Sequence, residues 1–216
     1  AGMIPEGLNN YLALLGWSIS PDNDVFSMEE MAAAFDISDV NPNPARFDPK
    51  KCIAINAEHI RLLEPDDFRG RIVPFLHRDG LVSADSFDEL TADEQKIMQH
   101  ASPLIQTRIQ LLGEAPGMLG FLFTEDDALE LDEKSVSKLK ENAPEVLDAT
   151  IHFIENYDGP FTTEALEHAL RELIVESMDI KPRIAFGPIR VAVTGRQVSP
   201  PLFESMEILG RESVLN

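Results

Sequence analysis

Few of the reactive side chains in this 216-residue chain have the spacing that catalytic or metal-binding motifs require. The five histidines lie far apart in the sequence, at His59, His77, His100, His152 and His168. There is no HExxH motif, no glycine-rich phosphate loop and no Cys/His spacing suited to zinc. The sequence therefore predicts no catalytic residues and no metal ligands.

The single cysteine, Cys52, stands in an apolar stripe with Ile53 and Ile55 and has no histidine near it in the sequence. This setting is typical of a small packed hydrophobic residue rather than of a nucleophile. One cysteine also excludes an intramolecular disulfide, which is consistent with a reducing compartment. No apolar run approaches the roughly 18 residues of a membrane helix, so we expect a cytoplasmic protein without a membrane partner.

Charge is distributed unevenly along the chain. The sequence has 18 Lys and Arg against 38 Asp and Glu, a net charge of −20, which excludes a generally basic nucleic-acid coat. Residues 101–113 nevertheless contain one base, Arg108, and no acid. Residues 181–196 contain four bases and no acid: Lys181, Arg183, Arg190 and Arg196. Such islands could meet the phosphates or bases of a polyanion, or pair with the surplus acids on the surface.

The sequence predicts that these residues are positioned by helices. Ser27 with Glu30 forms a capping-box pattern, and Asp48 followed by Pro49 forms another helix start. A short amphipathic helix is expected from Pro5 to Gly16. Further helices are expected at about 66–78, 91–101, 103–113, 133–141, 144–157, 162–178 and 187–195, with a last one starting at Ser199-Pro200. Because alternating strand patterns are nearly absent, the sequence predicts an all-α fold.

Several stretches, in order along the chain, resemble bacterial-type glutamyl-tRNA synthetases. PEGLNNYLALLGWS (5–18), FSMEEMAAAFD (26–36) and PARFDPKKCIAINAEHIR (44–61) resemble the family segment that follows its catalytic signature loop. FLFTED (121–126) resembles its Leu-Phe-Thr-Glu-Asp stretch, and PIRVAVTGRQVSPPLFESMEILGRE (188–212) resembles its C-terminal signature. Together these matches cover essentially the whole chain at the family's spacing.

The resemblance implies the tRNA-binding C-terminal portion of such an enzyme. It implies a stem-contact helical region at 1–64, followed by two anticodon-binding helical domains at 65–130 and 131–216. The family's ATP-binding domain has a His-x-Gly-His-like motif and a Lys-Met-Ser-Lys-like loop, and neither is present here. We therefore expect no cofactor in this portion, while the parent enzyme would use ATP and Mg2+ to join glutamate to its tRNA.

The resemblance also implies which residues contact tRNA. Arg108 falls where a family arginine reads the third anticodon base, with a surface salt bridge as the alternative. Arg190, Ser199, Pro200, Leu202 and Phe203 match residues that cradle the other anticodon bases. Phe203 is expected to be a partly exposed stacking platform, with a core position in the last helix as the alternative. Lys50, Lys51 and Arg61 are candidates for phosphate contacts along the stem.

The sequence thus predicts a monomer that recognises tRNA(Glu), and also tRNA(Gln) if recognition does not discriminate between the two. The rival hypothesis is an acidic helical protein-interaction module that does not bind RNA, with Arg108 and Arg190 in structural ion pairs.

Overall fold

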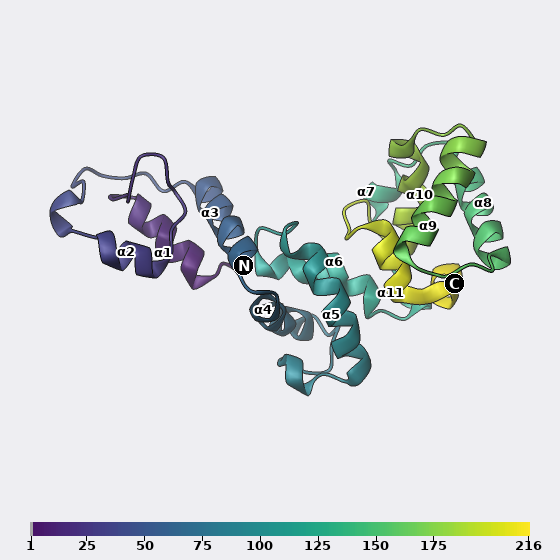
Figure 1. Cartoon of the computed structure of the whole chain (residues 1–216), viewed down its shortest axis with the longest axis horizontal. Coiled ribbons are helices and arrows are strands. Elements are labelled where there is room, and N and C mark those ends of the chain that lie inside the picture. Colours follow the sequence, from purple (N-terminus) through teal and green to yellow (C-terminus); the bar gives the residue numbers. More distant parts are fainter. Residues whose placement is uncertain (1) are drawn as a thin grey trace. The chain divides into compact units, whose positions relative to one another are not determined.

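The computed structural model describes residues 2–216, and the side chains of all of these except Pro182 and Arg183. Over these residues the chain folds into eleven α-helices joined by 3-10 turns and loops (Figure 1). Within the same range, β pairing is confined to an isolated bridge between Ser20 and Asn23. No helix in this range combines the length and apolar character needed to cross a bilayer. The predicted all-α class is confirmed.

Two compact units make up the fold. The first comprises the residues up to Thr91 together with Ser102–Gly117, and the second comprises Ala92–Ala101 together with Met118–Asn216. The three domains expected at 1–64, 65–130 and 131–216 stay a prediction, because compactness alone divides the chain into two units.

The first unit is built on the packing of α1 against α3. Tyr11 of α1 packs with Cys52 and Ile55 of α3 in a small core cluster. The Tyr11 hydroxyl also accepts a hydrogen bond from the Asp48 backbone N–H at 2.5 Å. The α-helices that lie wholly in this unit are α1 (Pro5–Leu14), α2 (Met28–Ala34), α3 (Pro49–Leu62) and α4 (Pro65–Arg78).

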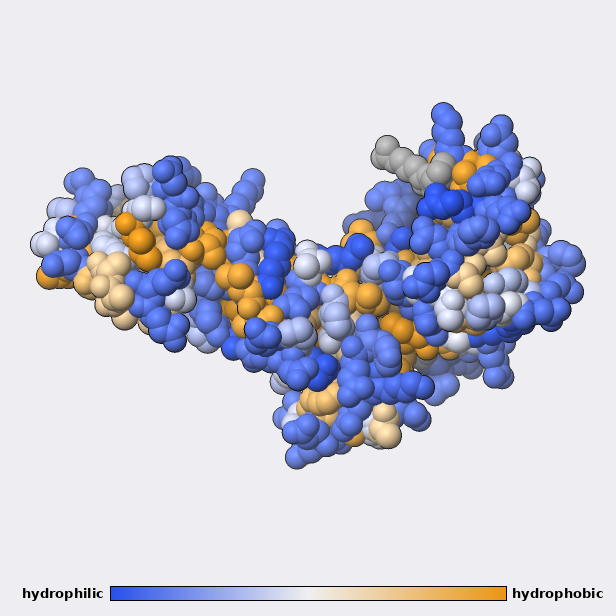
Figure 2. All heavy atoms as spheres, in the orientation of Figure 1, coloured by the Kyte–Doolittle hydropathy of each residue, from blue (hydrophilic) through white to orange (hydrophobic). Residues whose placement is uncertain are grey.

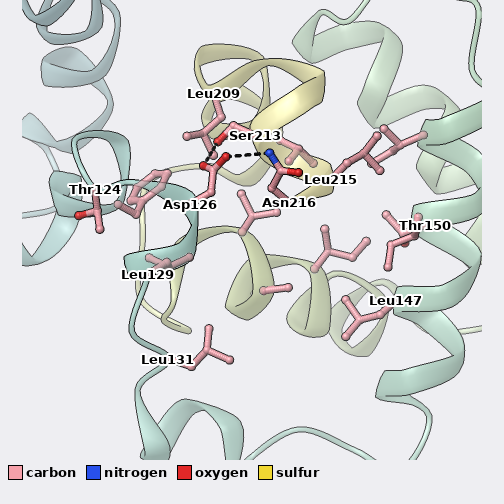
Figure 3. Close-up of a pocket in the computed structure, with 17 residues that line it drawn as sticks. Thr124, Asp126, Leu129, Leu131, Leu147, Thr150, Leu209, Ser213, Leu215 and Asn216 are labelled. Atoms are coloured by element: carbon pink, nitrogen blue, oxygen red, sulfur yellow. Dashed lines mark hydrogen bonds between the residues drawn. The ribbon is translucent and has the colours of Figure 1, made fainter.

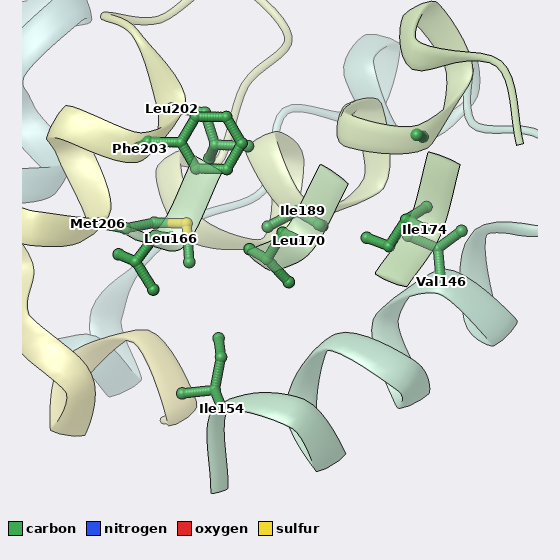
Figure 4. Close-up of a cluster of buried hydrophobic side chains, with 10 residues drawn as sticks. Val146, Ile154, Leu166, Leu170, Ile174, Ile189, Leu202, Phe203 and Met206 are labelled. Atoms are coloured by element: carbon green, nitrogen blue, oxygen red, sulfur yellow. The ribbon is translucent and has the colours of Figure 1, made fainter. Parts of the chain in front are cut away.

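The second unit encloses a larger cluster of buried side chains, to which five helices contribute. These side chains include Val146, Ile154, Leu166, Leu170 and Ile189 (Figure 4). The α-helices that lie wholly in this unit are α7 (Glu133–Val136), α8 (Ala143–Asn156), α9 (Thr163–Leu170), α10 (Pro182–Thr194) and α11 (Leu202–Leu215). A π-helix, Arg171–Ser177, follows α9 directly. Two further helices, α5 (Ala92–Gln106) and α6 (Ala115–Leu119), have residues in both units.

Local capping signals place the helix starts correctly. The Ser27 hydroxyl accepts the Glu30 N–H at 3.1 Å, and the Glu30 carboxylate accepts the Ser27 N–H at 2.7 Å, which completes the predicted capping box. Asp48 accepts the N–H groups of Lys50 and Lys51 at 2.9 and 3.3 Å, with Pro49 in the first turn. These side chains satisfy backbone donors that a helix start leaves free.

Two prolines that the sequence places at helix boundaries, Pro103 and Pro188, lie inside helices. The break expected between helices at 91–101 and 103–113 is wrong, and so is the end of the second, because α5 continues through Pro103 and ends at Gln106. The helix expected from Gly187 is also wrong at its start, because α10 begins at Pro182 and contains Pro188. An internal proline costs a helix about 3 kcal/mol. Burial of neighbours such as Ala101 and Ile105, both 0% exposed, offsets that cost.

Apolar side chains remain exposed around α1 and α2. Leu12 of α1 and Met28 and Met31 of α2 line a shallow groove together with Phe35. Leu12, Met28 and Phe35 are each close to half exposed. Figure 2 shows such orange apolar patches among the hydrophilic surface of this part of the chain.

Candidate nucleic-acid interface

Arg108 lies just beyond α5, in a connection that leads to the 3-10 turn Leu112–Glu114. Its backbone N–H donates to the Ile105 carbonyl at 2.8 Å, and the next residue, Ile109, is buried. The Arg108 side chain is exposed. Among the residues whose side chains are described, no acid forms an ion pair with its guanidinium. Its five donors are therefore available to a ligand, and the alternative of a surface salt bridge is not found.

Arg190, on α10, braces the turn that leads into α11. Its Nη1 donates to the Ser199 hydroxyl at 2.8 Å and to the Pro200 carbonyl at 2.7 Å. The Ser199 hydroxyl donates to the same carbonyl at 2.9 Å. The structure thus gives Arg190 an intramolecular role in fixing this turn, while its contact with RNA stays a prediction.

The expected partial exposure of Phe203 is wrong. Ser199, Pro200, Leu202 and Phe203 are all buried, and Phe203 is only 9% exposed. The Phe203 ring lies edge-on to Phe186, with 5.3 Å between the ring centroids and 80° between the planes. Figure 4 shows Phe203 and Leu202 among the buried side chains of the second unit. Phe203 is a core residue, the alternative considered from the sequence, because α9, α10 and α11 surround it with apolar partners.

The exposed positions of this region lie just before that buried segment. Arg196 is exposed, and Val198 is 75% exposed, the second highest value among the large exposed hydrophobic side chains. At the other end of the basic stretch, Lys181 is exposed, whereas the side chain of Arg183 lies outside the described residues.

The three phosphate candidates on α3 differ in their partners. Lys51 pairs with Asp24 at 2.9 Å, and Arg61 pairs with Glu58 one turn earlier on the helix. Lys50 is exposed, and no described residue forms an ion pair with it. Exposed ion pairs are weak, so all three cations remain able to meet a phosphate. Their contact with RNA stays a prediction.

The reactive residues singled out from the sequence have structural surroundings. Cys52 is 1% exposed and packs with apolar neighbours, and burial raises the pKa of its thiol, as expected for a packed hydrophobic residue. His59 is 6% exposed, and its Nε2 lies 2.7 Å from Asn10 Oδ1. Within the described part of the chain, no three His, Cys, Asp or Glu side chains come together as a metal-binding group.

A largely apolar cavity of about 330 Å³ lies within the second unit (Figure 3). Asp126 lines it and accepts hydrogen bonds from Ser213 and from Asn216, the latter at 3.1 Å. Leu129 and Leu147 are among its apolar lining residues. None of the RNA-contacting residues predicted from the sequence lines this cavity, so it is separate from the candidate interface.

Comparison with known proteins identifies the family. Residues 67–216 match the family described as anticodon binding domain. The glutamate–tRNA ligase of Bifidobacterium adolescentis is 56% identical over 212 residues, covering 98% of this chain and 42% of that protein. The glutamate–tRNA ligase of Kocuria rhizophila is 56% identical over 214 residues, covering 99% of this chain and 41% of that protein. The chain thus spans about two fifths of the length of these curated relatives.

A solved structure with a similar fold is that of a glutamate tRNA ligase from Elizabethkingia meningosepticum in complex with its amino acid. The TM-score is 0.75 at 23% sequence identity, and the match covers 99% of this chain and 40% of that chain. At this identity the likeness supports the helical fold. The family match, in contrast, extends over most of the sequence, from residue 67 to residue 216. The chain belongs to the anticodon-binding domain family, and over nearly its whole length it is similar to glutamate–tRNA ligases.

Proposed function

We propose that this chain is the tRNA-recognition portion of a glutamate–tRNA ligase and binds the anticodon arm of tRNA(Glu). Family membership favours this function over the rival protein-interaction module. The single structural observation that carries the proposal is Arg108: an exposed guanidinium without an ion pair among the described residues, in a chain of net charge −20.

Arg108 suits the third base of a glutamate anticodon. That base is C in glutamate anticodons and G in glutamine anticodons, and the two have opposite donor and acceptor patterns. A guanidinium has donors only, which match the O2 and N3 acceptors of an unpaired cytosine. Splayed single-stranded bases are the usual targets of sequence-specific RNA recognition. We therefore expect tRNA(Glu) to bind more tightly than tRNA(Gln).

Affinity would come from cations that contact phosphates along the arm. Lys50, Lys51 and Arg61 are the candidates on α3, and Arg196 is the exposed candidate beyond α10. The acidic remainder of the chain would repel RNA and so confine contact to these positions. We propose a cytoplasmic monomer as the form that binds.

We also propose that ATP, Mg2+ and the aminoacylation chemistry belong to a part of the ligase outside this chain. This proposal rests on the chain spanning about two fifths of the length of its curated relatives. Glutamate-dependent pyrophosphate exchange with ATP should stay at the no-enzyme level, with or without tRNA. Exchange above that level would overturn this assignment.

Titration with tRNA(Glu) at two salt concentrations tests the proposed function. Each phosphate contact releases counterions, so binding should weaken steeply between about 50 and 200 mM salt. An acidic protein-interaction module would show no RNA binding at either concentration. Equal affinity for tRNA(Glu) and tRNA(Gln) would show that the chain binds RNA but does not discriminate between the two tRNAs.

A further inference from the structure

Arg108 lies in a short connection, 107–111, whose ends are both held by carboxamide side chains. On the first side, Gln106 is the last residue of α5. Its Nε2 donates to the carbonyls of Ile60 and Leu63 at 3.0 and 2.8 Å. These carbonyls belong to the C-terminal end of α3, where a helix lacks its own donors. Gln106 therefore fixes the end of α5 to the end of α3.

On the second side, Asn56 of α3 holds the backbone two residues after Arg108. Asn56 is 0% exposed, and its Nδ2 donates to the Gln110 carbonyl at 2.6 Å. Its Oδ1 accepts the Ile4 N–H at 2.8 Å. One buried amide thus joins α3, the segment before α1 and the connection that contains Arg108.

The surroundings of Asn56 leave it little freedom. Gly7 packs so closely that an added Cβ would lie 2.7 Å from the Asn56 Cα. A further bond runs from the Leu112 N–H to the Gly2 carbonyl at 2.9 Å. Leaving a buried carboxamide without its partner is unfavourable, so these hydrogen bonds favour one register of connection 107–111 against α3.

We infer that Asn56 and Gln106 are positioning residues for Arg108, holding its guanidinium in the register that reads the third anticodon base. This inference rests on the proposed function. Neither side chain needs to touch RNA, because each acts through the backbone on one side of Arg108. Removing the hydrogen bonds of either side chain leaves the charge of Arg108 in place but allows its guanidinium to occupy a wider range of positions. Discrimination between bases should then fall more than overall affinity.

The test measures the ratio of dissociation constants for two anticodon stem-loops. One has the glutamate anticodon, and the other has its third base changed from C to G. The variants are Asn56→Ala and Gln106→Met, each alone and in an Arg108→Gln background. Gln106→Met removes the donor but keeps a long side chain, so it serves if Asn56→Ala does not fold.

Asn10→Ala is the matched control. Asn10 is also a buried asparagine of the first unit, at 2% exposure. It donates to the Asp24 carbonyl at 3.0 Å and accepts the Phe26 N–H at 3.0 Å, and its Oδ1 lies 2.7 Å from His59 Nε2. It thus holds the loop before α2 and has no bond to connection 107–111. Its loss should lower stability without changing the base preference. All binding is measured at a temperature where each variant is folded.

We expect Asn56→Ala and Gln106→Met each to lower the ratio of dissociation constants for the two stem-loops by about threefold or more. An effect of this size is usual between residues coupled in one hydrogen-bond network. In the Arg108→Gln background the same changes should have no further effect on the ratio. An equal effect of Asn10→Ala, or an effect that persists without Arg108, would overturn the positioning role. If Arg108→Gln lowers the preference for C over G at the third base but Asn56→Ala and Gln106→Met do not, only this inference fails. An unchanged ratio in Arg108→Gln alone overturns the proposed reader as well.

Discussion

Replacing Phe203 with alanine tests whether this aromatic residue stabilises the fold or contacts RNA. The ring is 9% exposed within the cluster of the second unit and lies edge-on to Phe186. Truncating a buried phenylalanine costs about 3–5 kcal/mol through lost burial and the cavity left behind. The aromatic pair contributes about 0.5–1.5 kcal/mol beyond its buried area, so we expect the upper half of that range.

Val198→Ala is the matched control for this experiment. Val198 lies five residues earlier and is 75% exposed, so its truncation should change stability by no more than about 0.5 kcal/mol. The single tryptophan, Trp17, lies in the first unit, so its fluorescence does not report on this cluster. Backbone hydrogen exchange of α10 and α11 reports on this cluster, because it measures the free energy of opening of the second unit.

The expected result is fast exchange in Phe203→Ala and unchanged exchange in Val198→Ala. Binding of the glutamate anticodon stem-loop by Phe203→Ala should recover under conditions that keep the second unit folded. The reasoning is refuted if Phe203→Ala leaves the exchange of α10 and α11 unchanged while RNA binding is lost. That result would return Phe203 to the role of a base-stacking platform.

Three other changes have clear expectations. Arg190→Lys keeps the charge but not the guanidinium Nη1 that donates to both acceptors in the 199–200 turn, so denaturation should show a loss of about 1 kcal/mol. Gly195→Ala forces a non-glycine residue to a φ of 75° and places a Cβ 2.7 Å from the Glu130 carbonyl, so a loss of more than about 1 kcal/mol is expected by the same assay. Burial lowers the pKa of His59, so the unfolded chain takes up this proton more readily, and stability should fall as the pH drops below about 6.5. His59→Gln should flatten that pH profile in urea midpoints, whereas a profile identical to that of the wild type would contradict the assignment.

Local signals made much of the helical fold predictable. The Ser27–Glu30 capping box and the Asp48-Pro49 start depend on residues close in sequence, and both occur as expected. Pro103 misled the prediction because its local preference opposes a helix, while burial of distant contacts favours one. Propensity is a weak guide where tertiary packing opposes it.

The candidate site was predictable in its residue types but not in its geometry. Arg108 stood out because it lies in an acid-free stretch of an acidic chain. The burial of Phe203 depends on Phe186, which no local pattern connects with it. The hydrogen bond between Asn56 and the Gln110 carbonyl joins residues 54 positions apart, so the fold alone reveals it.

We propose that Arg108 discriminates between the third bases of glutamate and glutamine anticodons. The most direct measurement is the ratio of dissociation constants for C-ending and G-ending anticodon stem-loops, in the wild type and in Arg108→Gln. Arg78→Gln is the control, because Arg78 is another exposed arginine of the first unit and pairs with Asp79. A good base contact is worth about 1–3 kcal/mol, so the ratio should fall by roughly 5- to 150-fold in Arg108→Gln and stay unchanged in Arg78→Gln. Equal ratios in the wild type and Arg108→Gln would contradict the claim.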